Sequence, residues 1–247
     1  MFDALKLIRL SGESAWIVIR SVPVAPAAGQ ADVGAEELRT WLRRQISVWP
    51  APLAIGVDKP RLDDAAVVFE PAQSTDRYAC RLGADGSLVL ALPAGGIRES
   101  PIDGERVRVV GEGAVAWITV ATTRLAAAYA ERAGVHGDTS LELAIASSER
   151  SQDASFEVWN HGPDGFGRAG TRLAAVRPAH ATVDLAACRS ERVAGLVRPL
   201  LLDVLGQFGL AESRHINSDG IIQCRDFTGH DQRILDWTTA AGVPSQP

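Results

Sequence analysis

Apolar residues recur at helical spacing in several segments of the chain. In the first such segment Leu38, Trp41 and Leu42 follow a period of three to four residues, and Pro50 ends the pattern. The pattern predicts four helices, over residues 32–49, 112–133, 190–208 and 229–241. The third of these contains Pro199, where we expect a kink or a break in the helix.

Short runs of apolar and β-branched residues between these segments are typical of strands. The strongest hairpin signal is the turn Gly83-Ala84-Asp85-Gly86, which lies between two such runs. A second hairpin is expected around Gly12. The predicted strands cover residues 5–10, 15–19, 53–57, 65–69, 77–82, 87–92, 106–110, 141–146, 156–159, 172–176, 182–187 and 221–225.

Strands and helices do not alternate regularly, which favours an α+β fold over a doubly wound α/β fold. We therefore expect mixed, largely antiparallel sheets with about four helices packed on them. Residues 92–104 contain two Pro and three Gly and are the best linker candidate. They divide the chain into an N-terminal subdomain, 1–100, and a C-terminal subdomain, 101–247, although one domain is also compatible with this length.

The composition is that of an ordinary globular protein. Of the 247 residues 46% are hydrophobic and 22% are charged, which suffices for a core without disulfides or metal. The net charge of −5 argues against strong non-specific attraction to nucleic acid or anionic membranes. The N-terminus lacks the pattern of a signal peptide and no apolar run is long enough to span a membrane, so we expect a cytoplasmic protein.

The sequence predicts no metal site and no cofactor. The three cysteines are far apart, without CxxC or Cys–His spacing. The one GxGxxG match, from Gly165 to Gly170, is followed by too few residues for the helix that a dinucleotide site requires. We interpret it as a Gly-rich loop that joins two strands.

Four residues are candidates for acid–base chemistry. His161 and Asp164 share a short polar segment, where an imidazole and a carboxylate would form a general-base pair. The same segment, Gly-Pro-Asp-Gly, is also a turn signature. His215 and Asp219 form a second polar cluster. A hydrolase built around the loop with His161 and Asp164 is therefore one functional hypothesis.

Arg39, Arg43 and Arg44 form the densest basic cluster on any predicted element. Three guanidinium groups on one helix would contact the phosphates of a nucleic acid. The alternative is a solvated helix face opposite a buried stripe of Trp and Leu. A nucleic-acid-associated module is the second alternative hypothesis.

No combination of residues identifies a nucleophile, a metal set or a phosphate cradle. We therefore favour a non-enzymatic cytoplasmic interaction or regulatory module over an enzyme. Such a module would bind a protein partner, or a second copy of itself, through a groove or an exposed apolar patch.

Overall fold

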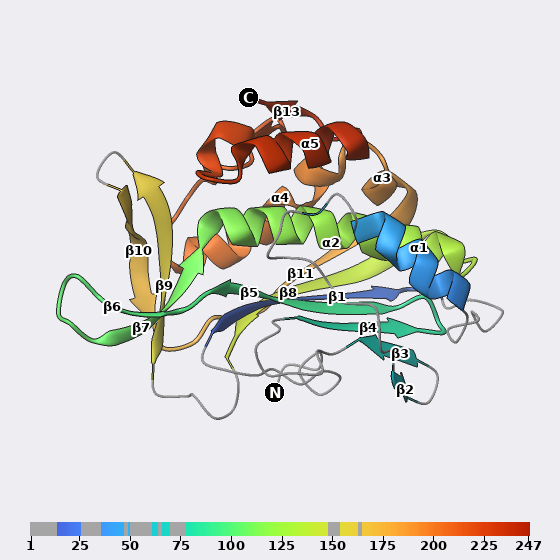
Figure 1. The fold of residues 1–247 in the computed structure, drawn as a ribbon, viewed down its shortest axis with the longest axis horizontal. Coiled ribbons are helices and arrows are strands. Elements are labelled where there is room, and N and C mark those ends of the chain that lie inside the picture. Colours follow the sequence, from blue (N-terminus) through green and yellow to red (C-terminus); the bar gives the residue numbers. More distant parts are fainter. Residues whose placement is uncertain are drawn as a thin grey trace.

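The computed structural model describes residues 14–25, 36–46, 49, 61–63, 66–69, 78–147, 154–162 and 165–247. Its described part contains a seven-stranded sheet, one face of which is covered by helices, and a four-stranded sheet at one end of this layer (Figure 1). The prediction of an α+β fold with mixed, largely antiparallel sheets is confirmed.

The seven-stranded sheet is antiparallel throughout. Its strands are, in spatial order, β11 (Ala179–Asp184), β8 (Asp138–Ala146), β1 (Ala15–Pro23), β5 (Leu88–Gly95), β4 (Ala79–Gly83), β3 (Ala66–Phe69) and β2 (Arg61–Asp63). Both faces of β1 are buried, since Ile17 and Ile19 join the main core and Trp16 and Val18 join a second cluster. The hairpin predicted around Gly83–Gly86 is confirmed as β4–β5.

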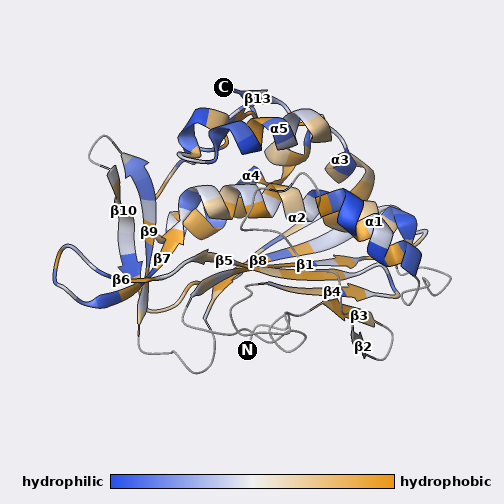
Figure 2. Cartoon of the chain, viewed as in Figure 1, coloured by the Kyte–Doolittle hydropathy of each residue, from blue (hydrophilic) through white to orange (hydrophobic). Residues whose placement is uncertain are grey.

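A buried central helix organises the helical layer. The helices are α1 (Glu36–Ile46), α2 (Glu112–Arg132), α3 (Leu185–Arg189), α4 (Val193–Gln207) and α5 (Asp231–Ala241). Helix α2 is buried on almost all sides, and the Tyr129 hydroxyl near its end donates to the carbonyl of Gly83 at 2.8 Å. Helix α4 continues through Pro199 without a break. Figure 2 shows hydrophobic residues concentrated on α2 and on the facing strands.

The chain passes from the larger sheet to the smaller one at Gly95. The smaller sheet contains, in order, β10 (Gly165–Leu173), β9 (Ser155–Gly162), β7 (Arg106–Gly111) and β6 (Ile97–Glu99). A Cβ at Gly95 would lie 2.3 Å from the carbonyl oxygen of Val109, so this crossing requires glycine. Strand β7 then leads directly into α2, which places Glu112 at the junction of the sheet and the helix.

Strands from both predicted subdomains share the larger sheet. Strand β1 pairs with β5 on one side and with β8 on the other. The linker candidate 92–104 forms the end of β5, strand β6 and the following turn. The division into subdomains 1–100 and 101–247 stays a prediction.

Two predicted strands end differently in the structure. Strand β11 ends at Asp184, whose carboxylate accepts the N–H of Ala187 at 2.8 Å and thereby starts α3, so the predicted strand over 182–187 is too long. The segment 221–225 forms only the short β12 (Ile222–Gln223), which pairs with β13 (Ser245–Gln246), before a 3₁₀ turn. The predicted strands 5–10 and 53–57 lie outside the described residues.

None of the helices in the described segments combines the length and the apolar character needed to cross a membrane.

Candidate interaction face

The two faces of the four-stranded sheet differ in character. On the inner face, Val110 of β7 and Val158 of β9 lie side by side and join the main core. The strand registers place alternate residues on the outer face, away from this core. These outer-face residues are Arg98, Val107, Val109, Glu157, Trp159, His161, Phe166, Arg168 and Arg172.

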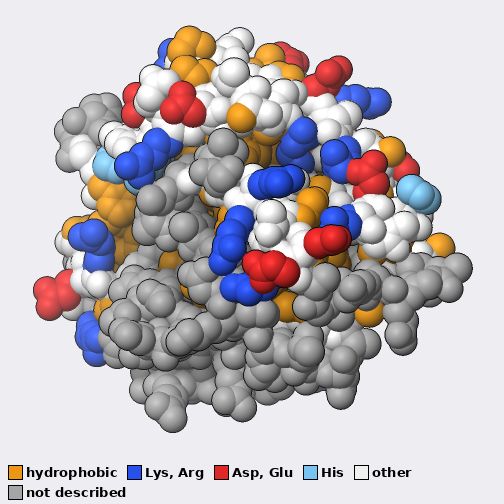
Figure 3. All heavy atoms as spheres, turned by 45° about the vertical axis from the view of Figure 1, so that its right-hand side comes forward, with side chains coloured by type: hydrophobic (Ala, Val, Ile, Leu, Met, Phe, Trp, Pro, Cys, Tyr) orange, Lys and Arg blue, Asp and Glu red, His pale blue; other side chains and the backbone are white. Residues whose placement is uncertain are grey.

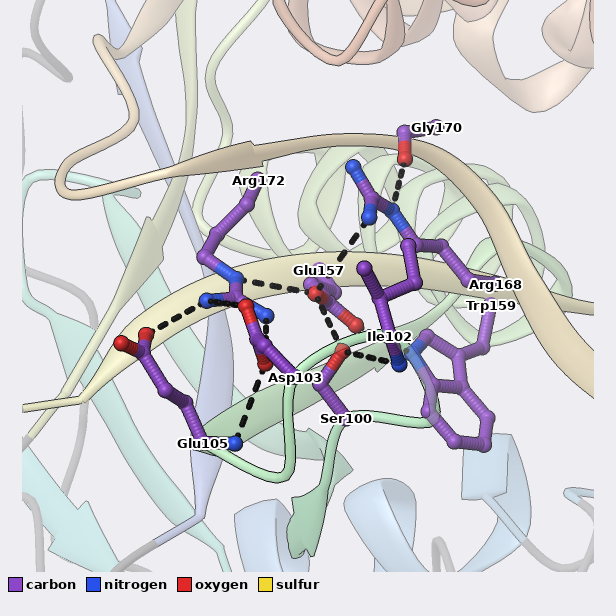
Figure 4. A network of polar contacts seen from close by, with 9 residues as sticks. All are labelled: Ser100, Ile102, Asp103, Glu105, Glu157, Trp159, Arg168, Gly170 and Arg172. Carbon is purple, nitrogen blue, oxygen red and sulfur yellow. Dashed lines mark hydrogen bonds and ion pairs between the residues drawn. The ribbon is translucent and has the colours of Figure 1, made fainter.

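A fully buried carboxylate, Glu157, lies at the centre of the outer face (Figure 4). Its Oε1 accepts Nε of Arg172 at 2.9 Å and the hydroxyl of Ser100 at 3.2 Å. Its Oε2 accepts the indole N–H of Trp159 at 3.1 Å, and Arg168 Nη1 lies 3.9 Å from Oε1. Glu157 is therefore paired and hydrogen-bonded, which is the condition for keeping a charge in a protein interior.

Arg172 joins Glu157 to the turn between β6 and β7. Its Nη2 donates to Asp103 at 2.9 Å, and its Nη1 donates to Glu105 at 2.6 Å. The hydrogen bond from Arg172, and then the backbone N–H of Glu105, hold the pKa of Asp103 below its usual range. These contacts fix the turn against the sheet and leave Ile102 at its tip with 67% of its surface exposed.

Beside this network, three aromatic rings and one guanidinium form a continuous cluster. The ring of Phe166 lies 5.5 Å from that of Trp159 and 4.8 Å from that of His161. The guanidinium carbon of Arg98 lies 5.9 Å from the Trp159 ring centroid and 5.8 Å from that of Phe166. We call Arg98, Trp159, His161 and Phe166 the aromatic cluster. Phe166 and His161 are exposed, whereas Trp159 is buried and bonded to Glu157, so the cluster rests on the ionic network.

The GxGxxG segment belongs to this face. Residues 165–170 form most of β10, so our interpretation of them as a loop joining two strands is wrong. The last glycine is needed for packing, since a Cβ at Gly170 would lie 2.5 Å from the carbonyl oxygen of Phe208. The predicted strand 172–176 overlaps only the end of β10.

His215, a predicted catalytic candidate, lies instead in a sealed cluster on the inner side of β9. Its Nδ1 is 3.2 Å from Oε1 of Glu112, and its Nε2 is 3.0 Å from the carbonyl oxygen of Asp226. Glu112 also accepts from Ser213, from the backbone N–H of Arg214 and from Asn160. Both His215 and Glu112 are buried, and both ring nitrogens of His215 have hydrogen-bond partners, while a catalytic role of His215 stays a prediction.

The pKa of Glu112 reflects this arrangement. Burial raises it, but the hydrogen bond and the charge of His215, with the donors of Asn160 and Arg214, outweigh burial and leave the pKa below its usual value. Glu112 is also at the first turn of α2, where the helix dipole stabilises a negative charge.

The structure describes two of the other three candidates, His161 and Asp219. Asp219 is exposed, whereas His215 is buried. The ring of His161 packs on Phe166, while Asp164 lies outside the described residues, so their pairing stays a prediction. Where side chains are described, no three His, Cys, Asp or Glu gather closely enough to hold a metal ion.

The predicted arginine cluster of α1 is divided. Arg39 lies 2.5 Å from Glu36 and Arg43 lies 3.9 Å from it, so one carboxylate partly neutralises both. Arg44 lines a cavity between helices. The nucleic-acid hypothesis for this face stays a prediction.

The sites predicted from the sequence did not include Arg98, Glu157, Trp159 or Phe166. A signal was available for part of this set. Trp159 and His161 alternate along one strand, and Phe166 follows on the next, beyond the Gly-Pro-Asp-Gly turn. Hairpin pairing places such residues on one face. Nothing near Arg98 in the sequence indicates its place beside them.

Comparison of the chain with protein-family models, with curated proteins and with solved structures gives no match.

Proposed function

We propose that this chain is a cytoplasmic, non-enzymatic interaction module that binds a protein partner through the outer face of the four-stranded sheet. The observation that carries the proposal is the exposure of Phe166 within the aromatic cluster. The large hydrophobic side chains that are most exposed in the described segments are Val24, Ile102 and Phe166, and two of these three belong to this face or to the turn fixed on it. Exposed apolar groups gathered in one place are typical of interaction sites.

The composition of the face supports a protein contact. Tryptophan, tyrosine and arginine dominate the binding energy of protein interfaces, and aromatic residues are enriched at their centres. Here Arg98 lies against the rings of Trp159 and Phe166. A matching partner segment would place an apolar side chain against Phe166 and Ile102 and a carboxylate beside Arg98.

The ionic network below the aromatic cluster favours binding because it holds the contact surface in place before a partner arrives. Glu157 and Arg172 connect both β-hairpins of this sheet. A surface that is already ordered loses little conformational entropy on binding.

The charge around the face favours a protein over a nucleic acid. Aromatic rings and arginine also bind single-stranded nucleic acids by stacking. However, the carboxylates of Glu99, Asp103 and Glu105 lie on β6 and the adjoining turn, and the chain has a net charge of −5. These carboxylates offset the arginine charges of the face, so little net positive charge remains to attract a phosphate backbone.

The cysteines agree with a reducing compartment such as the cytoplasm. Cys80, Cys188 and Cys224 are all buried free thiols. Burial raises the pKa of the Cys80 thiol to about 12, so this group is an unreactive part of the core.

Site-specific photo-crosslinking tests the proposed face. A photoreactive phenylalanine analogue replaces Phe166 or Ile102 in cells that produce the protein, and the matched control carries it at the exposed Val24. We expect one protein to be crosslinked from positions 166 and 102 and not from position 24. The affinity of that purified protein for Phe166→Ala or Arg98→Ala should then be at least about tenfold weaker than for the unmodified chain, as for interface hot spots.

The stability of the two alanine variants separates binding from folding. Both positions are at the surface, so we expect their free energies of unfolding to stay within about 0.5 kcal/mol of the unmodified value. Equal crosslinking from all three positions, or unchanged affinity in both variants, contradicts the proposal. If the chain binds single-stranded oligonucleotides and the same variants lose this binding, the partner is a nucleic acid and not a protein.

A further inference from the structure

The outer face of the four-stranded sheet carries both members of the contacts that a two-fold dimer requires. In such a dimer a group of one copy meets a different group of the other copy, and the same contact occurs twice. The face combines an apolar tip with an aromatic cluster, since Ile102 is 67% exposed and Phe166 is 38% exposed. In Figure 4, Ile102 and Trp159 lie on the same side of Glu157, and Glu105 lies on its opposite side. The apolar and the acidic parts of the turn are thus separated.

Arg98 supplies the basic member of a charge pair between two copies. Its side chain is exposed, and its guanidinium carbon lies within 6 Å of the ring centroids of Trp159 and Phe166. It makes no ion pair with any residue of the described segments. Contacts with ring faces do not use the N–H donors of a guanidinium, so these donors can bind a carboxylate.

Glu105 supplies the acidic member. Its side chain is 68% exposed, and its Oε2 accepts Nη1 of Arg172 at 2.6 Å. Its other oxygen, Oε1, has no hydrogen-bond partner in the described part of the chain. Because both oxygens of a carboxylate accept hydrogen bonds, Glu105 can accept from a second copy and still keep Arg172. Arg172 also holds the turn in place, so this acceptor is already oriented before two copies meet.

The charges of the outer face and its turn cancel, although the whole chain has a net charge of −5. The face and the turn carry three arginines and three carboxylates, which are Arg98, Arg168 and Arg172, and Asp103, Glu105 and Glu157. Two copies can therefore bring these faces together without net repulsion between them, and the basic group of one copy can meet the acidic group of the other.

The surface around α1 differs, because its charged groups are paired within one copy. In Figure 3, basic and acidic side chains lie next to one another around this helix. Arg39 and Arg43 both lie beside Glu36. Arg132 lies 4.0 Å from Glu37. Groups that are already paired gain little from a second copy, so the charges favour the outer face as the contact between copies.

We propose that the outer face binds a second copy of this chain in a two-fold dimer. Ile102 of each copy packs on Phe166 of the other. Arg98 of each copy pairs with Glu105 of the other, so both contacts occur twice. This inference rests on the proposed function and names the partner.

Charge reversal tests the pairing in the full chain, with sedimentation velocity as the measurement. We expect the unmodified chain to dimerise with a dissociation constant of about 100 µM or below, as for a small transient interface. Arg98→Glu and Glu105→Arg each bring like charges together twice, so each should weaken the dimer by at least about tenfold. In a mixed dimer of the two variants both pairs join opposite charges again. An equimolar mixture should therefore dimerise about as strongly as the unmodified chain, which two misfolded variants could not do.

The matched control is Glu37→Arg, which changes the net charge as Glu105→Arg does. Glu37 is 88% exposed and belongs to α1, at the opposite end of the molecule (Figure 1), so this variant should dimerise like the unmodified chain. A chain that stays monomeric at about 100 µM, single variants that dimerise unchanged, or a mixture as weak as the single variants would overturn the inference. If positions 166 and 102 then crosslink a different protein, the proposed function still stands, whereas failure of both experiments contradicts both proposals.

Discussion

Strand β9 separates two buried carboxylate systems that differ in their connection to the surface. On its inner side, Asn160 donates to Glu112, which is enclosed with His215. On its outer side, Glu157 pairs with Arg172, whose side chain is 19% exposed and reaches the carboxylates of the surface turn. Both carboxylates are at most 1% exposed, so the difference lies in their partners.

The two systems differ in the cation that pairs with the buried carboxylate. His215 holds Glu112 through one ring nitrogen, whereas the guanidinium of Arg172, which stays charged at any ordinary pH, bonds Glu157, Asp103 and Glu105. Loss of the Glu157 charge would therefore leave a fixed positive charge beside a buried polar group. The inner system joins the start of α2 to the segment with Ser213 and His215, and the outer system supports a contact surface.

The largest expected loss of stability comes from removing the charge of Glu157. We expect Glu157→Gln to lower the free energy of unfolding by about 3 kcal/mol, measured by urea denaturation. This is the lower end for a broken buried pair, because Asp103 and Glu105 still pair with Arg172. The matched control is Glu105→Gln on the exposed side of the same arginine, which should have a much smaller effect. Equal losses in the two variants would show that burial of Glu157 is not decisive.

An intermediate effect is expected from filling space beside the inner system. A Cβ at Gly113 would lie 2.8 Å from Nε2 of His215, whose ring is held on both sides. Overpacking costs about 1–3 kcal/mol, and the higher helix propensity of alanine offsets up to about 1 kcal/mol. We therefore expect Gly113→Ala to lose about 1–2 kcal/mol in the same measurement.

The control for this variant is Gly167→Ala in β10, where an added Cβ would meet no atom within 4 Å. We expect almost no change there. A Gly113→Ala protein as stable as the Gly167→Ala protein would mean that the inner cluster is loosely packed.

The smallest expected effect is a change in how the stability of the fold depends on pH. The pKa of Glu112 is below its usual value of 4.5, so the ionised carboxylate stabilises the fold above that pH. This contribution disappears as the pH falls through the lowered pKa. Glu112→Gln removes this contribution, because a glutamine side chain does not ionise.

As the pH falls below about 5, Glu112→Gln should therefore lose stability less steeply than the unmodified chain. Urea denaturation at a series of pH values measures this slope. Glu212→Gln, at a carboxylate that is 74% exposed, should keep the original slope. An unchanged slope in Glu112→Gln would assign the acid sensitivity to other groups.

The local sequence was sufficient to predict elements that depend on residues close together in the chain. The helix predicted over 112–133 is α2, and it ends next to Gly134, which adopts the positive φ typical of a residue that follows a helix. The hairpin around Gly83–Gly86 was predicted from its turn residues. The strand over 182–187 was predicted too long because the capping role of Asp184 competes with strand propensity and was overlooked.

The candidate sites were predictable only in part. His161 was predicted as half of an acid–base pair, and the structure shows it beside Phe166 in the aromatic cluster. His215 was identified as well, but its partner Glu112 comes from a distant helix start and was not.

By itself, the sequence determined the periodicity of the helices, the strands beside strong turns, and hence the α+β class, because these depend on neighbours within a few residues. Only the tertiary structure decided which side of β9 is sealed and which is open, and which groups Glu157 and Glu112 contact. The physical reason is that burial requires each polar group to find a partner, while the packing of distant segments decides which partner is within reach.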